Sequence, residues 1–205
     1  MSLVNEIIGN KISNYVACNL RFHKGVIALK NLINKDTIEE VNIYCGSYLP
    51  NWRPDANFRE VYSANKEMGG GVHIDLIHEL DYMFWIFGAP NHTRKTFKSN
   101  SSLNISAIDY ANYLCEYDRF CVNVILNYYR RDTKRICEVV TREGTYSLDL
   151  LKNEITFNSE VIYAEPQEPI DMYINQMDFF IKNKINTKSE FNTVEEAYKI
   201  LKICL

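Results

Sequence analysis

The sequence predicts an α+β fold in which a mostly antiparallel, open-faced sheet packs its helices on one side. The middle of the chain, residues 93–157, is a run of short segments with strand-like alternation, several of them joined by two-residue turn signals. Helical patterns stand before and after this run instead of between its strands. With 205 residues, 46% of them hydrophobic, the chain is long enough to bury one substantial core.

The N-terminal residues predict a strand without sequence neighbours. Residues 4–12 form a short amphipathic segment, and residues 14–20 (NYVACNL) have the apolar centre of a buried strand. The next segment, 24–33, has helical spacing, so no second strand follows to pair with the first. We therefore expect residues 1–22 to be the remnant of an upstream domain and residues 23–205 to form the main domain.

A strand and an unusual loop come next. Residues 40–48 (EVNIYCGSY) alternate apolar and polar side chains, as a half-buried strand does. The loop that follows, 49–68, holds two prolines and a high density of aromatic and cationic side chains for a plain connection. Its candidate ligand-binding residues are Trp52, Arg53, Tyr62 and Lys66.

The central run predicts an antiparallel meander. The expected strands are 93–98, 107–116, 120–129, 135–142, 145–150 and 154–157. Along 120–129, alternate residues from Phe120 to Tyr128 are apolar, whereas the other face is mixed and not charged. Such a face is expected to be covered by a partner. Two helices should close the chain, Pro169–Lys184 and 194–205, the second with Thr193 as its N-cap.

Composition excludes several classes of partner. The 23 basic and 26 acidic residues give a net charge of −3, which leaves no electrostatic footprint for nucleic acid or an anionic membrane. The apolar runs are short and no signal-peptide pattern opens the chain, so we expect a cytoplasmic protein. Six cysteines without a C-x-x-C pair indicate reduced, buried thiols.

The helix predicted after Gly69-Gly70-Gly71, residues 72–87, carries the candidate chemistry. At 100° per residue, His78, Tyr82 and Asp75 gather on one arc and the apolar residues on the other. Removing a hydroxyl proton during hydride transfer suits an imidazole, and a neighbouring carboxylate can fix its tautomer. Asp75 would do this for His78 or bind a substrate hydroxyl itself. Glycines before a helix allow a ligand to approach the backbone.

Two other interpretations of this segment stay open, and a third is excluded. The polar arc is also what a solvated face of an ordinary amphipathic helix looks like. His73, Asp75 and His78 would bind a metal only if His73 lay in the loop, because the two histidines point about 140° apart on a regular helix. The three glycines lack the G-x-G-x-x-G spacing and do not follow a strand, so they are no dinucleotide fingerprint.

These residues carry a family resemblance. The run GGGVHIDLIHELDYMFWIFG (69–88) resembles the central motif of the Gfo/Idh/MocA oxidoreductases, in which GGG, Asp, His, a further Asp, Trp and a closing Gly recur in this order. NLRFHKG (19–25) is similar to the family segment that leaves the nucleotide-binding domain. NYYRRDTKRICEVVTREGTYSLDL (127–150) is similar to the family's sheet region. Many members space the Asp and His by four residues, whereas here the spacing is three.

The resemblance implies a fold and a set of roles. The fold would be the glyceraldehyde-3-phosphate-dehydrogenase-like C-terminal domain, with residues 1–22 as a Rossmann remnant and 23–205 as the substrate-binding and oligomerising domain. His78 would be the catalytic acid/base and Asp75 its substrate-contacting companion. The implied substrate contacts in this sequence are Arg21, Tyr48, Trp52, Arg53, Tyr62, Lys66 and Tyr82.

The same resemblance implies cofactor and partners. NAD or NADP would serve the full-length parent, but none is expected bound to this fragment, whose G-x-G-x-x-G and E-K-P motifs are missing. The substrate would be a sugar, sugar acid or nucleotide sugar, and the open sheet face would form a homodimer or homotetramer. A fragment of this kind predicts about 110 to 130 upstream residues of βαβ pattern. A non-catalytic binding or assembly protein predicts a true start at Met1, and a metal-dependent hydrolase predicts tight zinc binding.

Overall fold

A computed structural model describes residues 2–10, 12, 14–184 and 191–205 of the chain. Its centre is an eight-stranded sheet with the strand order β2-β3-β4-β1-β5-β6-β7-β8. The strands are β1 (Ile38–Tyr48), β2 (His92–Lys98), β3 (Tyr110–Glu116), β4 (Cys121–Asn127), β5 (Tyr129–Thr141), β6 (Thr145–Asp149), β7 (Glu154–Phe157) and β8 (Glu160–Ala164).

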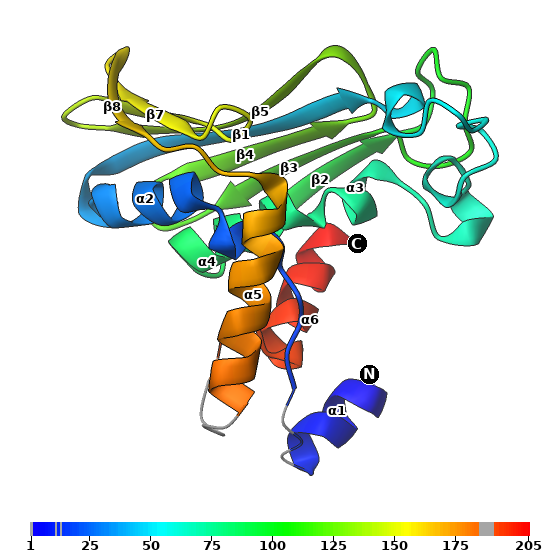
Figure 1. The fold of residues 1–205 in the computed structure, drawn as a ribbon, viewed down its shortest axis with the longest axis horizontal. Helices are drawn as coiled ribbons and strands as arrows, with labels where there is room; N and C mark the ends of the chain where they lie inside the picture. Colours follow the sequence, from blue (N-terminus) through cyan, green and yellow to red (C-terminus); the bar gives the residue numbers. More distant parts are fainter. Residues whose placement is uncertain (1, 11, 13, 185–190) are drawn as a thin grey trace.

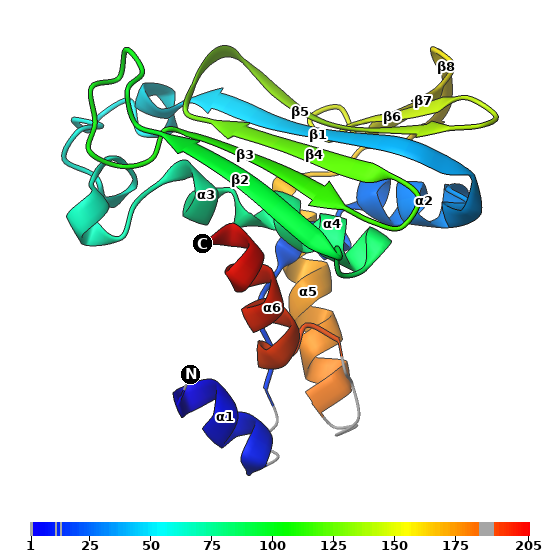
Figure 2. The same cartoon turned by 180° about the vertical axis from the view of Figure 1, so that it is seen from behind.

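The described helices lie on one side of this sheet, and none of them covers the other face, which we call the bare face (Figures 1 and 2). They are α1 (Ser2–Gly9), α2 (Lys24–Leu32), α3 (Val72–Asp75), α4 (Ile77–Phe87), α5 (Pro169–Lys184) and α6 (Val194–Cys204). Helices α2, α3 and α4 lie against the sheet, while α5, α6 and α1 extend away from it. The predicted α+β class and the open-faced, mostly antiparallel sheet are therefore confirmed.

The predicted meander is wrong in one respect. Strand β1 lies between β4 and β5, parallel to β4 and antiparallel to β5, so these two strands do not pair with each other. The reason is hydrophobic: Val41, Ile43 and Cys45 of β1 are 0 to 5% exposed and continue the apolar face of the sheet on both sides. The insertion makes β1, which comes first in sequence, a central strand.

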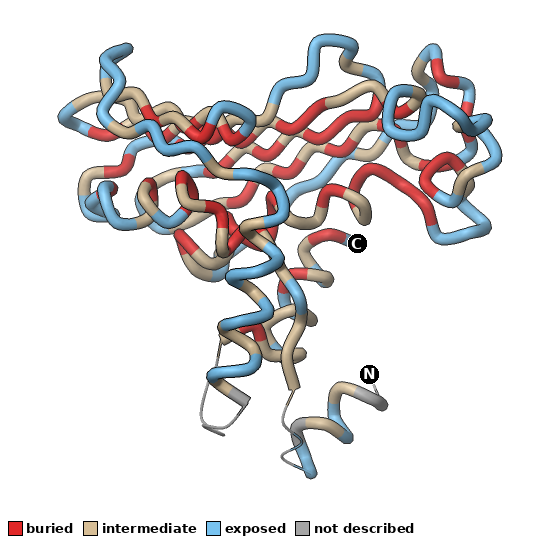
Figure 3. The backbone as a smooth tube through the Cα atoms, in the orientation of Figure 1, coloured by how far each residue is buried: buried red, intermediate tan, exposed pale blue. Residues whose placement is uncertain are grey.

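The core lies between the sheet and the helices. Val122, Val124, Leu126 and Tyr128 are fully buried, as the alternation along this stretch predicts. Figure 3 shows buried backbone concentrated in the middle strands and in the α3–α4 segment, whereas α5 is largely exposed. Two of the predicted tight turns have a residue with positive φ at the expected place, Gly144 at 156° and Asn153 at 55°.

The strand predicted over residues 14–20 is not formed. Residues 14–18 run in an irregular extended path, and Asn19–Phe22 is a short 3₁₀ helix. Without a neighbouring strand, this segment bonds the C-terminal part of the chain: the Val16 amide donates to the Asn192 carbonyl, and Asn14 Oδ1 accepts from the Val194 amide. Residue 11 of the predicted amphipathic segment lies outside the described residues.

Other boundaries also differ from the prediction. Strand β8 has no counterpart in the sequence analysis, and β5 begins at Tyr129, six residues earlier than expected. The N-cap of α6 is confirmed, since Thr193 accepts from the Glu196 amide at 3.2 Å. All six cysteines are free; four are buried, but Cys121 is exposed on the bare face, which corrects the expectation of uniform burial. Among the described residues, no helix has both the length and the apolar character that spanning a bilayer requires.

Candidate functional site

The segment predicted as one helix is broken into α3 and α4 at Leu76. Leu76 has φ −106° and ψ 28°, which interrupts regular helix geometry between Asp75 and His78. The two residues therefore end one helix and begin the next, instead of lying on adjacent turns of a continuous helix. Among the described residues, no hydrogen bond joins Asp75 to His78.

The three glycines fix the start of α3. A side chain at Gly70 would place its Cβ only 1.9 Å from the Tyr62 carbonyl oxygen, so this position requires glycine to pack against the loop. Gly71 has φ 144°, in the region that favours glycine, and is the N-cap of α3. These contacts hold the loop around Tyr62 and Ser63 close to the helix that ends at Asp75.

Asp75 is bound by a residue that the sequence analysis did not single out. The hydroxyl of Tyr128 donates to Asp75 Oδ2 at 2.6 Å. Burial raises the pKa of Tyr128, and its hydrogen bond to the Asp75 carboxylate raises it further, so this phenol stays protonated and acts as a donor. The sequence signal that could have identified Tyr128 was the alternation along residues 120–129, which placed it on the buried face near the end of that predicted strand.

Trp52 extends this group toward the surface. Its ring meets the Tyr128 ring edge to face, with centroids 5.4 Å apart and planes at 89°. The Trp52 indole nitrogen donates to Ser47 Oγ at 2.9 Å, which fixes the ring orientation. Trp52 keeps 39% of its surface exposed. The structure thus brings the loop residue Trp52, the residue Tyr128 between β4 and β5, and the helix residue Asp75 into one contact chain.

His78 lies one residue into α4 and is half-buried. Burial lowers its pKa; Glu79 acts in the opposite direction and Arg135 in the same direction as burial. Its Nδ1 is buried and has no hydrogen-bond partner within the described residues. With Nδ1 buried, Nε2 is the nitrogen through which this imidazole could exchange a proton with a substrate.

Two further polar residues of this arc, Glu79 and Tyr82, are buried against the sheet, so the interpretation of the arc as a solvated face is wrong. Glu79 is fully buried, and its Oε1 accepts from Arg135 Nε of β5 at 2.6 Å. Tyr82 is also fully buried, close to Cys137 and Cys45, and burial raises its pKa well above the usual value. Arg135 is the second residue of this region that sequence reasoning missed.

Arg21 is buried, and its guanidinium group is bound by two carboxylates. It is 2% exposed and donates to both carboxylate oxygens of Asp81 at 2.7 and 2.9 Å, and to Glu196 Oε2 at 3.1 Å. A bidentate pair of this kind ties the 3₁₀ helix before α2 to α4. In this arrangement the Arg21 guanidinium is committed to Asp81 and Glu196, whereas the Tyr82 hydroxyl is enclosed without a hydrogen-bond partner among the described residues.

The other predicted substrate contacts divide between two places. Arg53 lies over the Tyr62 ring, 5.8 Å from its centroid. Tyr62 also lies near Tyr128, whose pKa is raised mainly by burial, then by Asp75, and to a smaller extent by Tyr62. Lys66 is exposed in the same loop, and its backbone amide donates to Ser106 Oγ. Tyr48 lies elsewhere: it pairs with Tyr129 across β1 and β5, under the guanidinium of Arg131 at 4.3 Å.

His73 does not lie in the loop, which the metal interpretation required. It belongs to α3, is buried, and packs its ring against Phe97 at 5.3 Å. Burial lowers its pKa. The described residues contain no cluster of three or more histidine, cysteine or acidic side chains with metal-binding geometry.

Comparisons with known proteins show the family and the fold of the chain. The family model described as the oxidoreductase family, C-terminal alpha/beta domain, matches residues 30–201. A search of curated proteins finds no match. The chain is similar to the solved UDP-N-acetylglucosamine 3-dehydrogenase of Acidithiobacillus ferrooxidans, with TM-score 0.73 and 14% identity over 99% of this chain and 62% of the other.

Two further solved structures have the same fold. The aldose-aldose oxidoreductase of Caulobacter crescentus has TM-score 0.76 and 14% identity over 93% of this chain and 59% of the other. An Agrobacterium radiobacter oxidoreductase, solved with NAD⁺, L-tartaric acid and magnesium, has TM-score 0.71 and 15% identity over 99% and 64%. The chain thus spans about three fifths of the length of these structures. Since the family model covers most of the chain, the chain belongs to the Gfo/Idh/MocA oxidoreductase family, whose C-terminal α/β domain it contains.

Proposed function

We propose that this chain is the substrate-binding and oligomerising part of an NAD(P)-dependent oxidoreductase that acts on a hydroxyl of a sugar, sugar acid or nucleotide sugar. The observation that carries the proposal is the contact chain of Trp52, Tyr128 and Asp75, with the neutral His78 next along the helical segment. An exposed indole beside a carboxylate suits a sugar ring, which needs an apolar platform and acceptors for its hydroxyls. The similar structures named for sugar substrates support this class.

In this proposal, Asp75 orients the substrate and His78 takes the proton. Tyr128 occupies Asp75 Oδ2, which leaves Oδ1 to accept from a sugar hydroxyl. His78 Nδ1 is buried, so Nε2 would accept the proton of the reacting hydroxyl. Because burial lowers the pKa of His78, its ring is neutral and ready to act as a base near pH 7.

In this proposal the run Gly69-Gly70-Gly71 is not a dinucleotide site. The glycine run precedes the one-turn helix α3 and does not follow a strand, and the carbonyl of Tyr62 fills the space beside Gly70. NAD or NADP would therefore bind to another part of the parent enzyme and supply the hydride chemistry there. The role proposed for the described chain is limited to substrate binding, orientation and proton transfer.

Among the predicted substrate contacts, the loop residues fit the proposal best. Arg53 and Lys66 provide cations at the edge of the Trp52–Tyr62 region, where a carboxylate or phosphate of the substrate would lie. Arg21 and Tyr82 are bound or buried within the protein, so we leave them out of the proposed site. Tyr48 contacts Arg131 and is also left out.

Two exposed surfaces support the proposal that the chain works within a larger assembly. The bare sheet face carries half-buried Leu114, Ile125 and Ile136 between polar residues, and we propose it as the homodimer or homotetramer surface. Helix α5 exposes a second apolar stripe, 53 to 59% accessible along its length. Its members are Ile170, Tyr173, Ile174, Met177 and Ile181.

The catalytic proposal is tested in the intact parent enzyme with NAD or NADP and a panel of sugars. His78→Ala should lower kcat by about a hundredfold or more with cofactor affinity unchanged, because the general base is lost. Lys182→Ala, an exposed change on α5, is the control. Unchanged turnover of His78→Ala would reject the proposed role.

The oligomer proposal has its own measurement. Ile125→Glu places a charge in the middle of the bare face without touching the core on the other side of β4. Analytical ultracentrifugation should then show dissociation into monomers, while Leu151→Glu, an exposed change in the turn between β6 and β7, should leave the assembly intact. A monomeric unsubstituted chain at micromolar concentration would contradict this part of the proposal.

A further inference from the structure

The unpaired charges of the bare face are segregated to two ends. Successive residues of a strand point to opposite faces, so the strand pairings define transverse rows of bare-face residues. The row nearest the loop 49–68 runs from Lys98 of β2 to Lys134 of β5. The rows farthest from that loop contain Glu138 of β5 and Glu40 of β1. We call Lys98, Arg131 and Lys134 the basic end of the face, and Glu40 and Glu138 its acidic end.

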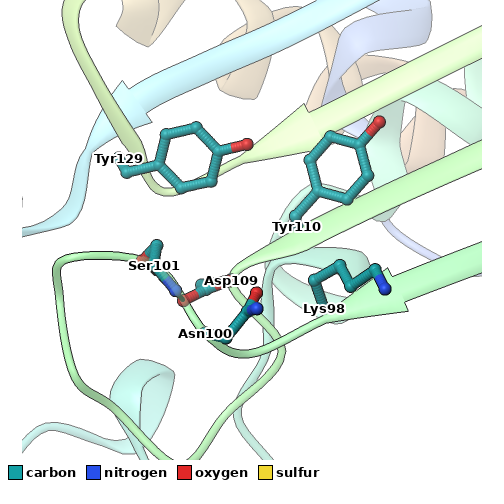
Figure 4. Close-up of a pocket in the computed structure, with 6 residues that line it drawn as sticks. All are labelled: Lys98, Asn100, Ser101, Asp109, Tyr110 and Tyr129. Carbon is teal, nitrogen blue, oxygen red and sulfur yellow. Dashed lines mark hydrogen bonds between the residues drawn. The ribbon is translucent and has the colours of Figure 1, made fainter.

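The cations of the basic end are not neutralised by the chain itself. Arg131 and Lys134 lie over the rings of Tyr48 and Tyr44, 4.3 and 5.9 Å from the ring centroids. Figure 4 shows Lys98 among the residues that line a pocket at this end, together with two tyrosine rings. In the described part of the chain, no ion pair joins any of the three cations to a carboxylate. Their charge is available to an acidic group of another molecule.

The carboxylates of the acidic end also have no cationic partner among the described residues. Glu40 accepts a hydrogen bond from the side-chain amide of Asn42, which lies opposite Glu138 across β1 and β5. Lys134 and Glu138 are four residues apart on the same strand, so their Cα atoms are separated by about 13 Å. The two ends therefore do not form an ion pair within one copy.

Most other charged groups on or beside this face are already paired. Three ion pairs account for them: Arg94–Glu116 at 3.1 Å, Arg130–Asp132 at 2.6 Å and Lys152–Asp149 at 3.7 Å. Of the remaining groups, His92 lies on the edge strand β2, and Glu154 lies on β7 at the other side of the sheet. The basic and acidic ends therefore dominate the charge pattern of the face.

The middle of the face, between the two ends, is apolar. Tyr44 of β1 lies between Ile125 of β4 and Ile136 of β5 in one row, and Leu114 of β3 lies in the next row. All four are half-buried, so they keep apolar surface that a partner could cover. A two-fold interface joins the same patch of both copies, so the patch must match itself. An apolar centre with opposite charges at its two ends meets this requirement.

The charge pattern favours one of the two ways in which the copies can face each other. If the strands of both copies run in the same direction, each basic end meets the basic end of the other copy, and like charges repel across the interface. If the strands run in opposite directions, each basic end meets an acidic end. Two-fold symmetry then repeats this favourable contact at both ends of the interface.

We infer that two copies pack bare face to bare face with their strands in opposite directions, so that the basic end of each copy contacts the acidic end of the other. The inference rests on the oligomer surface proposed above and specifies how a second copy is seated on it. The loop that carries Trp52 follows the end of β1 at the basic end. The two candidate sites therefore lie at opposite ends of the dimer, and neither copy supplies residues to the site of the other.

The test is zero-length cross-linking of the intact parent enzyme with a carbodiimide, which joins a lysine amine directly to a carboxylate. An equal mixture of ¹⁴N and ¹⁵N enzyme, in which native mass spectrometry shows mixed dimers, distinguishes links between copies from links within one copy. We expect mixed-isotope peptides that join Lys134 to Glu40 or Glu138. The control is the ion pair of Lys24 and Glu165, 3.3 Å apart within one copy, whose link should carry a single isotope.

The outcomes separate this inference from the proposals on which it rests. Mixed dimers without a link between the basic and acidic ends would overturn the inference and leave the oligomer surface standing. An enzyme that sediments as a monomer would overturn both. The proposed role of His78 is measured by turnover, which neither result decides.

Charge reversal gives an independent measurement. Lys134→Glu should raise the dimer dissociation constant by about tenfold, because like charges then meet at both contacts. Reversing as well the carboxylate that the cross-link identifies, as in Lys134→Glu with Glu138→Lys, should restore the affinity to within about threefold. Lys199→Glu, an equivalent exposed reversal on α6, should leave the affinity unchanged. The contact would be overturned if Lys134→Glu dimerised as tightly as Lys199→Glu, or if the double variant were no tighter than Lys134→Glu alone.

Discussion

The two ends of the α3–α4 segment present polar residues to very different surroundings. At the first end, Asp75 is half-buried and meets the hydroxyl of Tyr128, with Trp52 leading out to solvent. At the second end, Glu79 is fully buried against Arg135, and Tyr82 is enclosed between α4 and the sheet. We call these the loop end and the sheet end of the segment.

The difference shows that the role of a polar helical residue depends on what lies opposite it. The sheet end faces β1 and β5, where Arg135 supplies a countercharge to the fully buried Glu79. The loop end faces the connection 49–71, whose side chains Trp52 and Tyr62 are partly exposed to solvent. The polar arc seen in the sequence therefore contains a structural half and a half available for binding.

Substitution of the sheet end should have the largest effect. Glu79→Ala leaves Arg135, whose side chain is 24% exposed, beside α4 without its fully buried partner, and the cost should lie near the lower end of the about 3 to 5 kcal/mol typical of a buried pair. Chemical denaturation should show that loss in the free energy of unfolding. Asp75→Ala, at the more open loop end, should cost clearly less. Equal losses would remove the distinction between the two ends.

A double variant distinguishes the cost of leaving one charge unpaired from the stability that the ion pair itself contributes. Replacing both Glu79 and Arg135 by methionine removes the charges together and leaves apolar volume in their place. We expect the double variant to recover most of the stability that Glu79→Ala loses. A double variant as unstable as the sum of the single ones would show that the two charges act independently.

The second prediction concerns pH and the buried histidines. Burial lowers the pKa of His23, His73 and His78 in the folded chain below the usual 6.5. As the pH falls through about 6.5, the unfolded chain binds protons before the folded chain does, so stability is lost on acidification. Denaturation curves at several pH values between neutral and mildly acidic should show this fall. His23→Gln should make the fall shallower, and a flat profile would contradict burial of the three rings.

Much of the fold followed from local pattern, and what failed depended on distant partners. The alternation of β4 identified its buried face because one face of a sheet must cover a core. The position of β1 between β4 and β5 could not be read in the same way, since pairing of strands far apart in sequence leaves no local periodicity. Residues 14–18 had a strand-like composition but found no strand to pair with.

The candidate site was foreseen less completely. Asp75 and His78 stood out as a carboxylate and an imidazole near a glycine turn, but the break at Leu76 that separates them has no sequence signature of proline or glycine. Tyr128 was placed on the correct face without a partner, because its hydrogen bond to Asp75 joins residues 53 positions apart. Arg21 has the chemistry of a ligand-binding residue, and only the fold reveals that Asp81 and Glu196 bind it.

The third prediction weakens the loop end without removing a ring. Tyr128→Phe deletes the hydroxyl that donates to Asp75 and should cost about 1.5 to 3 kcal/mol in the free energy of unfolding, the range for a hydrogen bond to a charged group. Tyr163→Phe on β8 is the matched control and should cost much less. If Tyr128→Phe matched the control, Asp75 would not depend on this hydrogen bond.

The smallest effect on stability is expected at Trp52, where the effect on binding should instead be large. Trp52→Ala removes a ring that is 39% exposed and makes one edge-to-face contact with Tyr128, so the loss in unfolding free energy should be about 1 kcal/mol. If the loop end binds a sugar, the same change removes its stacking platform and should weaken sugar binding by tenfold or more in a calorimetric titration of the intact parent enzyme. The control is Met68→Ala, an exposed change in the same loop. Trp85→Ala would not serve, because the Trp85 ring lies 5.9 Å from the Arg21 guanidinium. The opposite result would be a Trp52→Ala variant that is destabilised as much as Glu79→Ala but binds sugar normally. Trp52 would then have a structural role, and the loop end would have no stacking surface for a sugar.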